Sequence, residues 1–80
     1  MNSNSVNNYN QNEINQTGKV SLSNASKEQL QTLNGIGEKI ADRIVKYRRN
    51  KGGFKTIDEI KQVKGIGDAL FEKIKTDITP

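Results

Sequence analysis

The sequence predicts a small all-α domain made of two helix–turn–helix copies, and two observations support this prediction. The tetrapeptide Asn-Gly-Ile-Gly at 34–37 returns thirty positions later as Lys-Gly-Ile-Gly at 64–67. Residues 26–45 also align with 56–75 without a gap, so that capping residues, apolar positions and glycines coincide. Each copy therefore holds a short helix, a Gly-Ile-Gly turn and a second helix.

The first helix of each copy has a start signal. Ser26 with Gln29, and Thr56 with Glu59, have the spacing of a capping box, in which a hydroxyl and a longer polar side chain satisfy each other's backbone N–H groups. The apolar positions that follow are Leu30 and Leu33 in the first copy and Ile60 and Val63 in the second.

The second helix of each copy follows its turn with apolar residues at helical spacing. These residues are Ile40, Ala41, Ile44 and Val45 in the first copy and Leu70, Phe71 and Ile74 in the second. Gly52 and Gly53 should end the longer helix, because glycine adopts the left-handed conformation common at helix ends. Phe54 can then fold back onto the core, whereas Tyr47 has no clear apolar role.

The two turns have the chemistry of an anion site. Gly35 and Gly65 stand where a helix ends and a positive φ is commonly needed, and the isoleucine of each turn should point inward. Gly37 and Gly67 precede the next helix, where no Cβ obstructs unpaired backbone N–H groups. These donors and the helix dipole favour phosphate. A dinucleotide site is excluded, because no strand precedes either turn and the third glycine is missing.

Composition narrows the possible functions further. The chain has 80 residues with net charge +4, and Glu13 is the only charge in residues 1–18, so residues 19–80 carry +5. A basic domain favours an acidic partner such as nucleic acid. Cysteine and histidine are absent, which excludes disulfides and the usual metal and nucleophile sites, and no run is long enough to span a membrane. Residues 1–18 are polar and Asn-rich, and we expect a disordered leader or linker.

With these motifs identified, the chain resembles the paired helix-hairpin-helix motifs of DNA-binding proteins, and residues 20–79 are similar to the C-terminal domain of bacterial competence proteins of the ComEA family. Two hairpins related by a pseudo-two-fold axis are implied, each holding one strand of duplex DNA across the minor groove without reading bases. We therefore expect residues 19–80 to be the DNA-binding domain, with no cofactor and no small-molecule substrate. The implied DNA-binding residues are Gly35, Ile36, Gly37, Lys39, Ile40 and Arg43 in the first copy and Lys64, Gly65, Ile66, Gly67, Ala69, Leu70 and Lys73 in the second.

Within that set, Lys39, Arg43, Lys64 and Lys73 would contact phosphate through their side chains, and the glycines, Ile40, Ala69 and Leu70 through backbone N–H groups. A second basic run, Arg48, Arg49 and Lys51, is expected to be a solvated face. In some relatives hairpin carbonyls bind a monovalent cation, which here would involve Gln31, Leu33 and Ile36.

The resemblance implies a receptor for DNA uptake in natural transformation, at the extracellular face of the membrane and anchored by an N-terminal helix that these 80 residues do not include. If the resemblance to competence proteins does not extend to function, a cytoplasmic location follows. Two alternatives stay open: a DNA-tethering module of a repair or recombination protein, and a protein–protein module like the sterile-alpha-motif domains. A base-excision enzyme is rejected, because no Gly-Pro-Asp triplet exists and Pro80 is the only proline.

Overall fold

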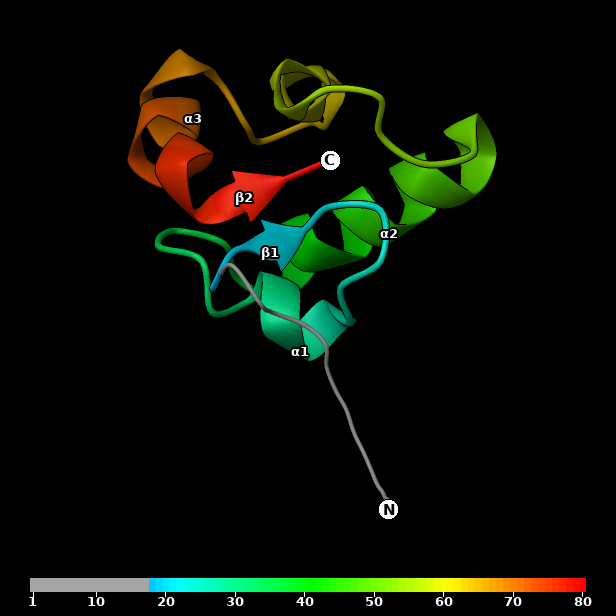
Figure 1. Ribbon diagram of the computed structural model, residues 1–80, viewed down its shortest axis with the longest axis horizontal. Helices are drawn as coiled ribbons and strands as arrows, with labels where there is room; N and C mark the ends of the chain where they lie inside the picture. Colours follow the sequence, from blue (N-terminus) through cyan, green and yellow to red (C-terminus); the bar gives the residue numbers. More distant parts are fainter. Residues whose placement is uncertain (1–17) are drawn as a thin grey trace.

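The computed structural model describes residues 18–80, and these form a mostly helical domain, as predicted (Figure 1). The helical elements in chain order are α1 (Lys27–Leu30), α2 (Glu38–Lys51), the 3-10 helix η2 (Ile57–Gln62), α3 (Asp68–Ile74) and the 3-10 turn η3 (Lys75–Asp77). The expected leader, residues 1–18, lies outside the described residues except for Gly18. No helix within residues 18–80 has the length and apolar character that a bilayer span requires.

Two short strands join the ends of the domain. β1 (Val20–Ser21) and β2 (Ile78–Thr79) pair in parallel, with Val20 opposite Ile78 and Ser21 opposite Thr79. The pairing continues beyond the strands, because the N–H of Leu22 donates to the carbonyl of Thr79 at 2.8 Å. In the view of Figure 1 the pair lies between α3 and α1. Strands of two residues carry no readable period, so the sequence did not predict them.

The first capping box forms as predicted. The Ser26 hydroxyl accepts a hydrogen bond from the Gln29 N–H at 3.1 Å, and the Gln29 side-chain oxygen accepts one from the Ser26 N–H at 2.8 Å. The reciprocal bonds satisfy two donors of the first turn, which matters because α1 itself is only four residues long.

The prediction of a second capping box is wrong. Thr56 precedes η2, but its side chain makes no capping hydrogen bond, and the element is a 3-10 helix. The Glu59 carboxylate accepts instead from the Lys55 N–H at 2.8 Å and from the Tyr47 hydroxyl at 2.7 Å. These donors stabilise the ionised carboxylate, so the Lys55 N–H first and the Tyr47 hydroxyl second lower the pKa of Glu59.

Tyr47 and Arg48 also differ from prediction, because both side chains pack inward from α2. The Tyr47 ring stacks on Phe54 with centroids 4.9 Å apart and an interplanar angle of 25°, which gives it the apolar role that the sequence did not indicate. The Arg48 Nη1 donates to the carbonyl of Leu22 at 3.0 Å and is half-buried rather than solvated. Burial first, and the nearby Arg49 charge second, lower the pKa of Arg48.

α2 ends at two glycines, as predicted. Gly52 has φ 78° and Gly53 has φ 115°, and the Gly53 N–H donates to the Arg48 carbonyl at 2.9 Å. The chain then reverses, and the Phe54 N–H donates to the Ser23 hydroxyl at 2.8 Å. Phe54 becomes buried through this reversal.

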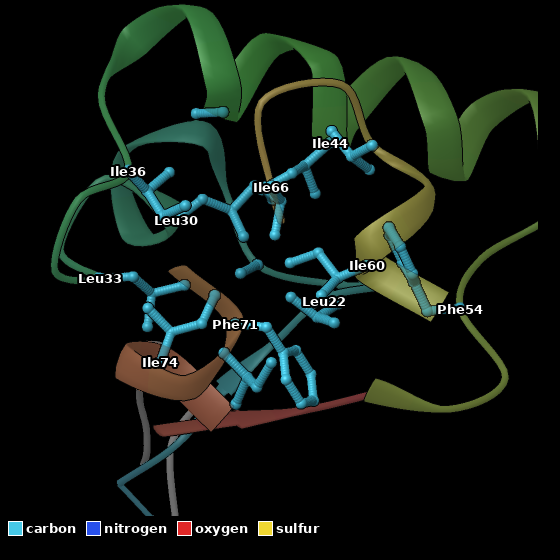
Figure 2. Packing of buried hydrophobic residues seen from close by; sticks show 14 residues of the cluster. Leu22, Leu30, Leu33, Ile36, Ile44, Phe54, Ile60, Ile66, Phe71 and Ile74 are labelled. Carbon is cyan, nitrogen blue, oxygen red and sulfur yellow. The ribbon is translucent and has the colours of Figure 1, made fainter. Parts of the chain in front are cut away.

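The core repeats with the same thirty-residue offset as the sequence. Equivalent positions are buried in both copies, and Ile36 and Ile66 point into one cluster with Leu30 and Ile44 (Figure 2). The buried equivalent pairs are Leu30 and Ile60, Leu33 and Val63, Ile36 and Ile66, Ala41 and Phe71, and Ile44 and Ile74. The two helix–turn–helix copies therefore pack face to face around a shared aliphatic core.

Candidate functional site

The two Gly-Ile-Gly turns have the same backbone geometry. Gly35 and Gly65 adopt φ values of 89° and 100°, in the region that side chains other than glycine's rarely adopt. In each turn the isoleucine N–H donates to the carbonyl three residues earlier, at 3.1 Å in the first turn and 3.0 Å in the second. The predicted positive φ is confirmed at both positions.

Gly37 and Gly67 begin α2 and α3 with extended backbone, at φ −94° and −100°. A methyl group built on either glycine would meet no heavy atom within 4 Å. These glycines are therefore not required by φ or by neighbouring atoms of the fold. What their lack of a side chain provides is open space at the start of each helix.

Unpaired donors surround that open space. The first backbone hydrogen bonds of the two helices run from the Ala41 N–H to the Gly37 carbonyl and from the Phe71 N–H to the Gly67 carbonyl, both at 3.0 Å. The earlier N–H groups have no acceptor inside their helix. Among the residues that the structure describes, no hydrogen bond engages the backbone N–H groups of Gly35, Gly37, Lys39, Ile40, Gly65, Gly67, Ala69 and Leu70.

The turns of the two copies contact each other reciprocally. A methyl group on Gly35 would lie 2.7 Å from Cδ1 of Leu70, and one on Gly65 would lie 3.4 Å from Cγ1 and 3.5 Å from Cδ1 of Ile40. Ile40 and Leu70 are equivalent positions, as are the two glycines. Each copy therefore places the first helical turn that follows its own hairpin against the hairpin of the other copy. Both turns lie together, as the predicted pseudo-two-fold arrangement requires.

Arg43 joins the two copies through a polar contact. Its Nη1 donates to the Lys64 carbonyl at 3.3 Å and lies 3.2 Å from a methyl group placed on Gly65. A residue assigned to the first copy is thus positioned beside the second turn.

Three predicted lysines are exposed near the turns. Lys39, Lys64 and Lys73 lie on the surface, and within residues 18–80 none of their ammonium groups has an ion-pair partner. Their charges therefore remain available to an outside anion.

The acids beside the turns are compensated by other lysines. Lys27 pairs with Glu38 at 3.1 Å and with Asp42 at 3.0 Å, and hydrogen bonds to Asp42 first and Glu38 second raise its pKa. Lys61 pairs with Asp68 at 3.4 Å. The sequence reasoning missed Lys27 and Lys61, because neither stands at a helical spacing from its partner and the pairing depends on how the helices pack.

The residues of the second basic run, Arg48, Arg49 and Lys51, differ in exposure. Arg48 is held by the Leu22 carbonyl, whereas Arg49 and Lys51 are exposed at the C-terminal end of α2. Cations are favourable there, because they offset the negative end of the helix dipole. Only Arg49 and Lys51 form the solvated face that was expected.

No group of three or more metal-binding side chains occurs among residues 18–80. Of the carbonyls suggested for a monovalent cation, those of Gln31, Leu33 and Ile36, the Leu33 carbonyl already accepts from the Ile36 N–H at 3.1 Å. Cation binding stays a prediction.

The sequence of this chain matches a known protein family and several known proteins. A family model described as a helix-hairpin-helix motif matches residues 15–79. ComE operon protein 1 of Bacillus subtilis (strain 168) is 45% identical over 60 residues, which cover 75% of this chain and 29% of that protein.

Two further relatives come from different settings. Endonuclease/exonuclease/phosphatase family domain-containing protein 1 of Xenopus laevis is 37% identical over 60 residues, 75% of this chain and 11% of that protein. An uncharacterized protein of Haemophilus influenzae (strain ATCC 51907 / DSM 11121 / KW20 / Rd) is 39% identical over 56 residues, 69% of this chain and 50% of that protein. The chain thus spans half or less of the length of each of these three relatives.

Proposed function

The chain belongs to the helix-hairpin-helix family, and from this membership we propose that residues 19–80 bind double-stranded DNA through its backbone phosphates with little dependence on base sequence. The observation that carries the proposal is the pair of unobstructed helix starts at Gly37 and Gly67, in two copies whose turns each contact the helix that follows the other turn. Two adjacent anion sites of equal geometry suit the two phosphate strands of a duplex.

Each hairpin would hold one strand. Backbone N–H groups of Gly35, Gly37, Lys39 and Ile40 would meet one strand, and those of Gly65, Gly67, Ala69 and Leu70 the other. Ile36 and Ile66, both buried, would anchor the turns from below. The side chains that would add phosphate contacts are Lys39, Arg43, Lys64 and Lys73. Contacts of this kind position a protein on DNA but carry no sequence information.

Electrostatics supports the same assignment. Because Lys27 and Lys61 neutralise the carboxylates at the helix starts, an approaching phosphate meets reduced repulsion there. The unpaired lysines around the turns then give the surface its positive sign. The domain binds and positions DNA in this proposal and has no catalytic part in it.

For the cellular role we propose capture of duplex DNA for uptake in natural transformation, at the extracellular face of the bacterial membrane. The similarity to ComE operon protein 1 supports this role. Labelled duplex applied to intact cells of the source organism tests it: uptake should fall when the gene is deleted, and protease added outside should remove the domain.

The alternative role is a DNA-tethering module of a larger repair or recombination protein. The match to a small part of endonuclease/exonuclease/phosphatase family domain-containing protein 1 favours this candidate, because it places the same motif in a much longer protein. Unchanged uptake after gene deletion, together with protection of the domain from external protease, would support the tethering role instead.

The biochemical test of DNA binding replaces both helix-starting glycines. Gly37→Val with Gly67→Val adds side chains where phosphate must approach, leaves the net charge unchanged and meets no neighbouring atom at Cβ. We expect the double variant to remain helical by circular dichroism and to lose about tenfold or more in duplex affinity, measured by fluorescence anisotropy.

Asn50→Val is the control, because it places the same valine side chain, without a change of charge, at an exposed position at the other end of α2. Its affinity should equal that of the parent. A folded double-valine protein that binds duplex DNA as the parent does would refute the phosphate site and reduce the glycines to helix caps.

A further inference from the structure

We propose that Asn34, directly before Gly35 in the first turn, is a site of spontaneous deamidation, and that its conversion to a carboxylate weakens the phosphate site beside it. The modification itself follows from the chemistry of this turn and needs no ligand. Its effect on affinity rests on the proposed binding of duplex DNA. The second turn has Lys64 at the equivalent position, so the change is confined to the first copy.

Both reacting groups of a deamidation are free at this turn. The Asn34 side chain is exposed, and within residues 18–80 no hydrogen bond engages its amide. The Gly35 N–H, which is the attacking group, also has no acceptor in the described part of the chain. Gly35 carries no Cβ, so no side chain on it obstructs the approach of the Asn34 amide. Asparagine side chains readily reach neighbouring backbone groups, and these two groups therefore can meet.

The reaction needs water and no other reactant. The Gly35 nitrogen gives its proton to hydroxide and attacks Cγ of Asn34, so that the N–Cγ bond forms and the Cγ–Nδ2 bond breaks. The departing nitrogen takes a proton from water and leaves as ammonia, and a cyclic imide remains without any change in oxidation state. Water then adds to either carbonyl of the imide and opens the ring. The product at position 34 is aspartate or isoaspartate.

Asn24 and Asn50 offer comparisons within the same chain, because their reacting groups are held by hydrogen bonds. The Nδ2 of Asn24 donates to Ser21 Oγ at 3.2 Å, and the N–H that follows, that of Ala25, donates to the Ser21 carbonyl at 2.8 Å. The residue after Asn50 still lies within α2, where backbone N–H groups bond to carbonyls one turn earlier. Of the three asparagines that the structure describes, only Asn34 therefore has both groups free.

The new carboxylate changes the electrostatics of the first turn. Aspartate is ionised at neutral pH, so deamidation adds a negative charge beside the unpaired N–H of Gly35. This charge repels phosphate and competes with it for the same backbone donors. Isoaspartate also lengthens the main chain by a carbon atom just before Gly35, which shifts the turn relative to the buried Ile36. Either product should lower the affinity of the first hairpin for duplex DNA.

Peptide mapping by mass spectrometry tests the modification without any DNA. The intact chain is kept at mildly alkaline pH, and the conversion of amide to acid at the three asparagines is followed over time. We expect Asn34 to convert about tenfold or more faster than Asn24 or Asn50. Equal rates at the three positions, or an Asn34 that stays unmodified, would overturn the inference.

Duplex affinity tests the consequence. Asn34→Asp introduces the charge of the product directly and should lower the affinity for duplex DNA about threefold or more. Asn50→Asp is the matched control, because it makes the same chemical change at an exposed position at the other end of α2. Its affinity should equal that of the parent. An unchanged affinity in Asn34→Asp, or an equal loss in Asn50→Asp, would overturn the effect on binding.

The alkaline incubation links the two measurements. The incubated parent should lose affinity in step with its conversion at Asn34, whereas Asn34→Gln incubated in the same way should keep its starting affinity. An equal loss in both proteins would contradict the assignment to Asn34. A fresh parent that does not bind duplex DNA would instead overturn the proposed function, and the mass measurement would still decide whether Asn34 is modified.

Discussion

At the scale of single residues, Arg48 and Arg49 show how two adjacent identical side chains acquire different roles. Arg48 is half-buried and its Nη1 donates to the Leu22 carbonyl at 3.0 Å, which ties α2 to the segment after β1. Arg49, the next residue of the helix, is exposed. The sequence could not separate them, because the partner of Arg48 lies 26 positions away and becomes its neighbour only in the folded chain.

The pair yields a stability prediction with its own control. Arg48→Ala leaves the Leu22 carbonyl without its donor and should lower the free energy of unfolding by about 1–3 kcal/mol. Arg49→Ala should change it by less than about 0.5 kcal/mol, as is usual for exposed positions. Urea unfolding followed by circular dichroism measures both, and equal values for the two variants would contradict the role given to Arg48.

Arg49 also supplies a binding control. Because Arg49 is exposed at the C-terminal end of α2, the end opposite the Gly-Ile-Gly turn, Arg49→Ala should reduce the salt slope of DNA binding by about one or less. A larger effect would bring the C-terminal end of α2 into the DNA interface.

At the scale of elements, the two copies start their first helices differently although their sequences match. Ser26 and Gln29 complete a capping box, whereas the Glu59 carboxylate bonds to Tyr47 and Lys55 and the Thr56 side chain caps nothing. Tyr47 lies on α2, outside the motif, so a local pattern could not reveal this competition. The two turns could be predicted, because the end of a helix and a positive φ depend on residues within the turn itself.

The contrast predicts unequal effects of two matched substitutions. Ser26→Ala removes a working cap and should lower the free energy of unfolding by about 1 kcal/mol. Thr56→Ala should lower it by less than about 0.5 kcal/mol, because no capping bond is lost. Thermal or urea unfolding at neutral pH measures the free energy of unfolding of both variants. A larger loss in Thr56→Ala than in Ser26→Ala would show that Thr56 does cap its helix.

At the scale of the whole molecule, the described part of the chain has few aromatic surfaces left for stacking on bases. Phe54 and Phe71 are buried, and Tyr47 stacks on Phe54. Single-stranded nucleic acid is generally held by such stacking together with a basic groove. This domain offers two paired phosphate sites instead, which suits two strands at once.

The expected outcome is that duplex DNA binds more tightly than either of its single strands at equal length. If four to six phosphates are neutralised, the logarithm of the binding constant should fall with the logarithm of salt concentration at a slope of about −4 to −5. Competition between duplexes of unrelated sequence should show less than about tenfold preference. Tighter binding of single strands, or strong preference for one sequence, would contradict this geometry.

The sequence predicted those features of the structure that depend on residues close together in the chain. The thirty-residue repeat predicted both turns, the helices that follow them and the buried isoleucines, all of which depend on local spacing. It did not predict the β1–β2 pair, the Lys27 and Lys61 ion pairs or the inward Tyr47. The strand pair and the Lys27 ion pairs join segments distant in the chain, and the Lys61 and Tyr47 contacts each cross a turn or a helix end, so all of them depend on how the elements pack.

The aliphatic contacts of Leu70 with Gly35 and of Ile40 with Gly65 have the form of an isologous dimer interface, in which a contact occurs twice with the roles exchanged. Here both partners belong to one chain, so dilution does not separate them as it would two associating subunits. Joining them also lets the halves differ. Phe71 stands opposite Ala41, and the Lys61 ammonium lies 4.7 Å from the centre of the Phe71 ring, a contact whose equivalent in the first half would have no ring. In a dimer of two identical chains, a substitution such as phenylalanine for alanine would occur in both halves. In this single chain it occurs in one hairpin only, so the two hairpins can differ in sequence and in function.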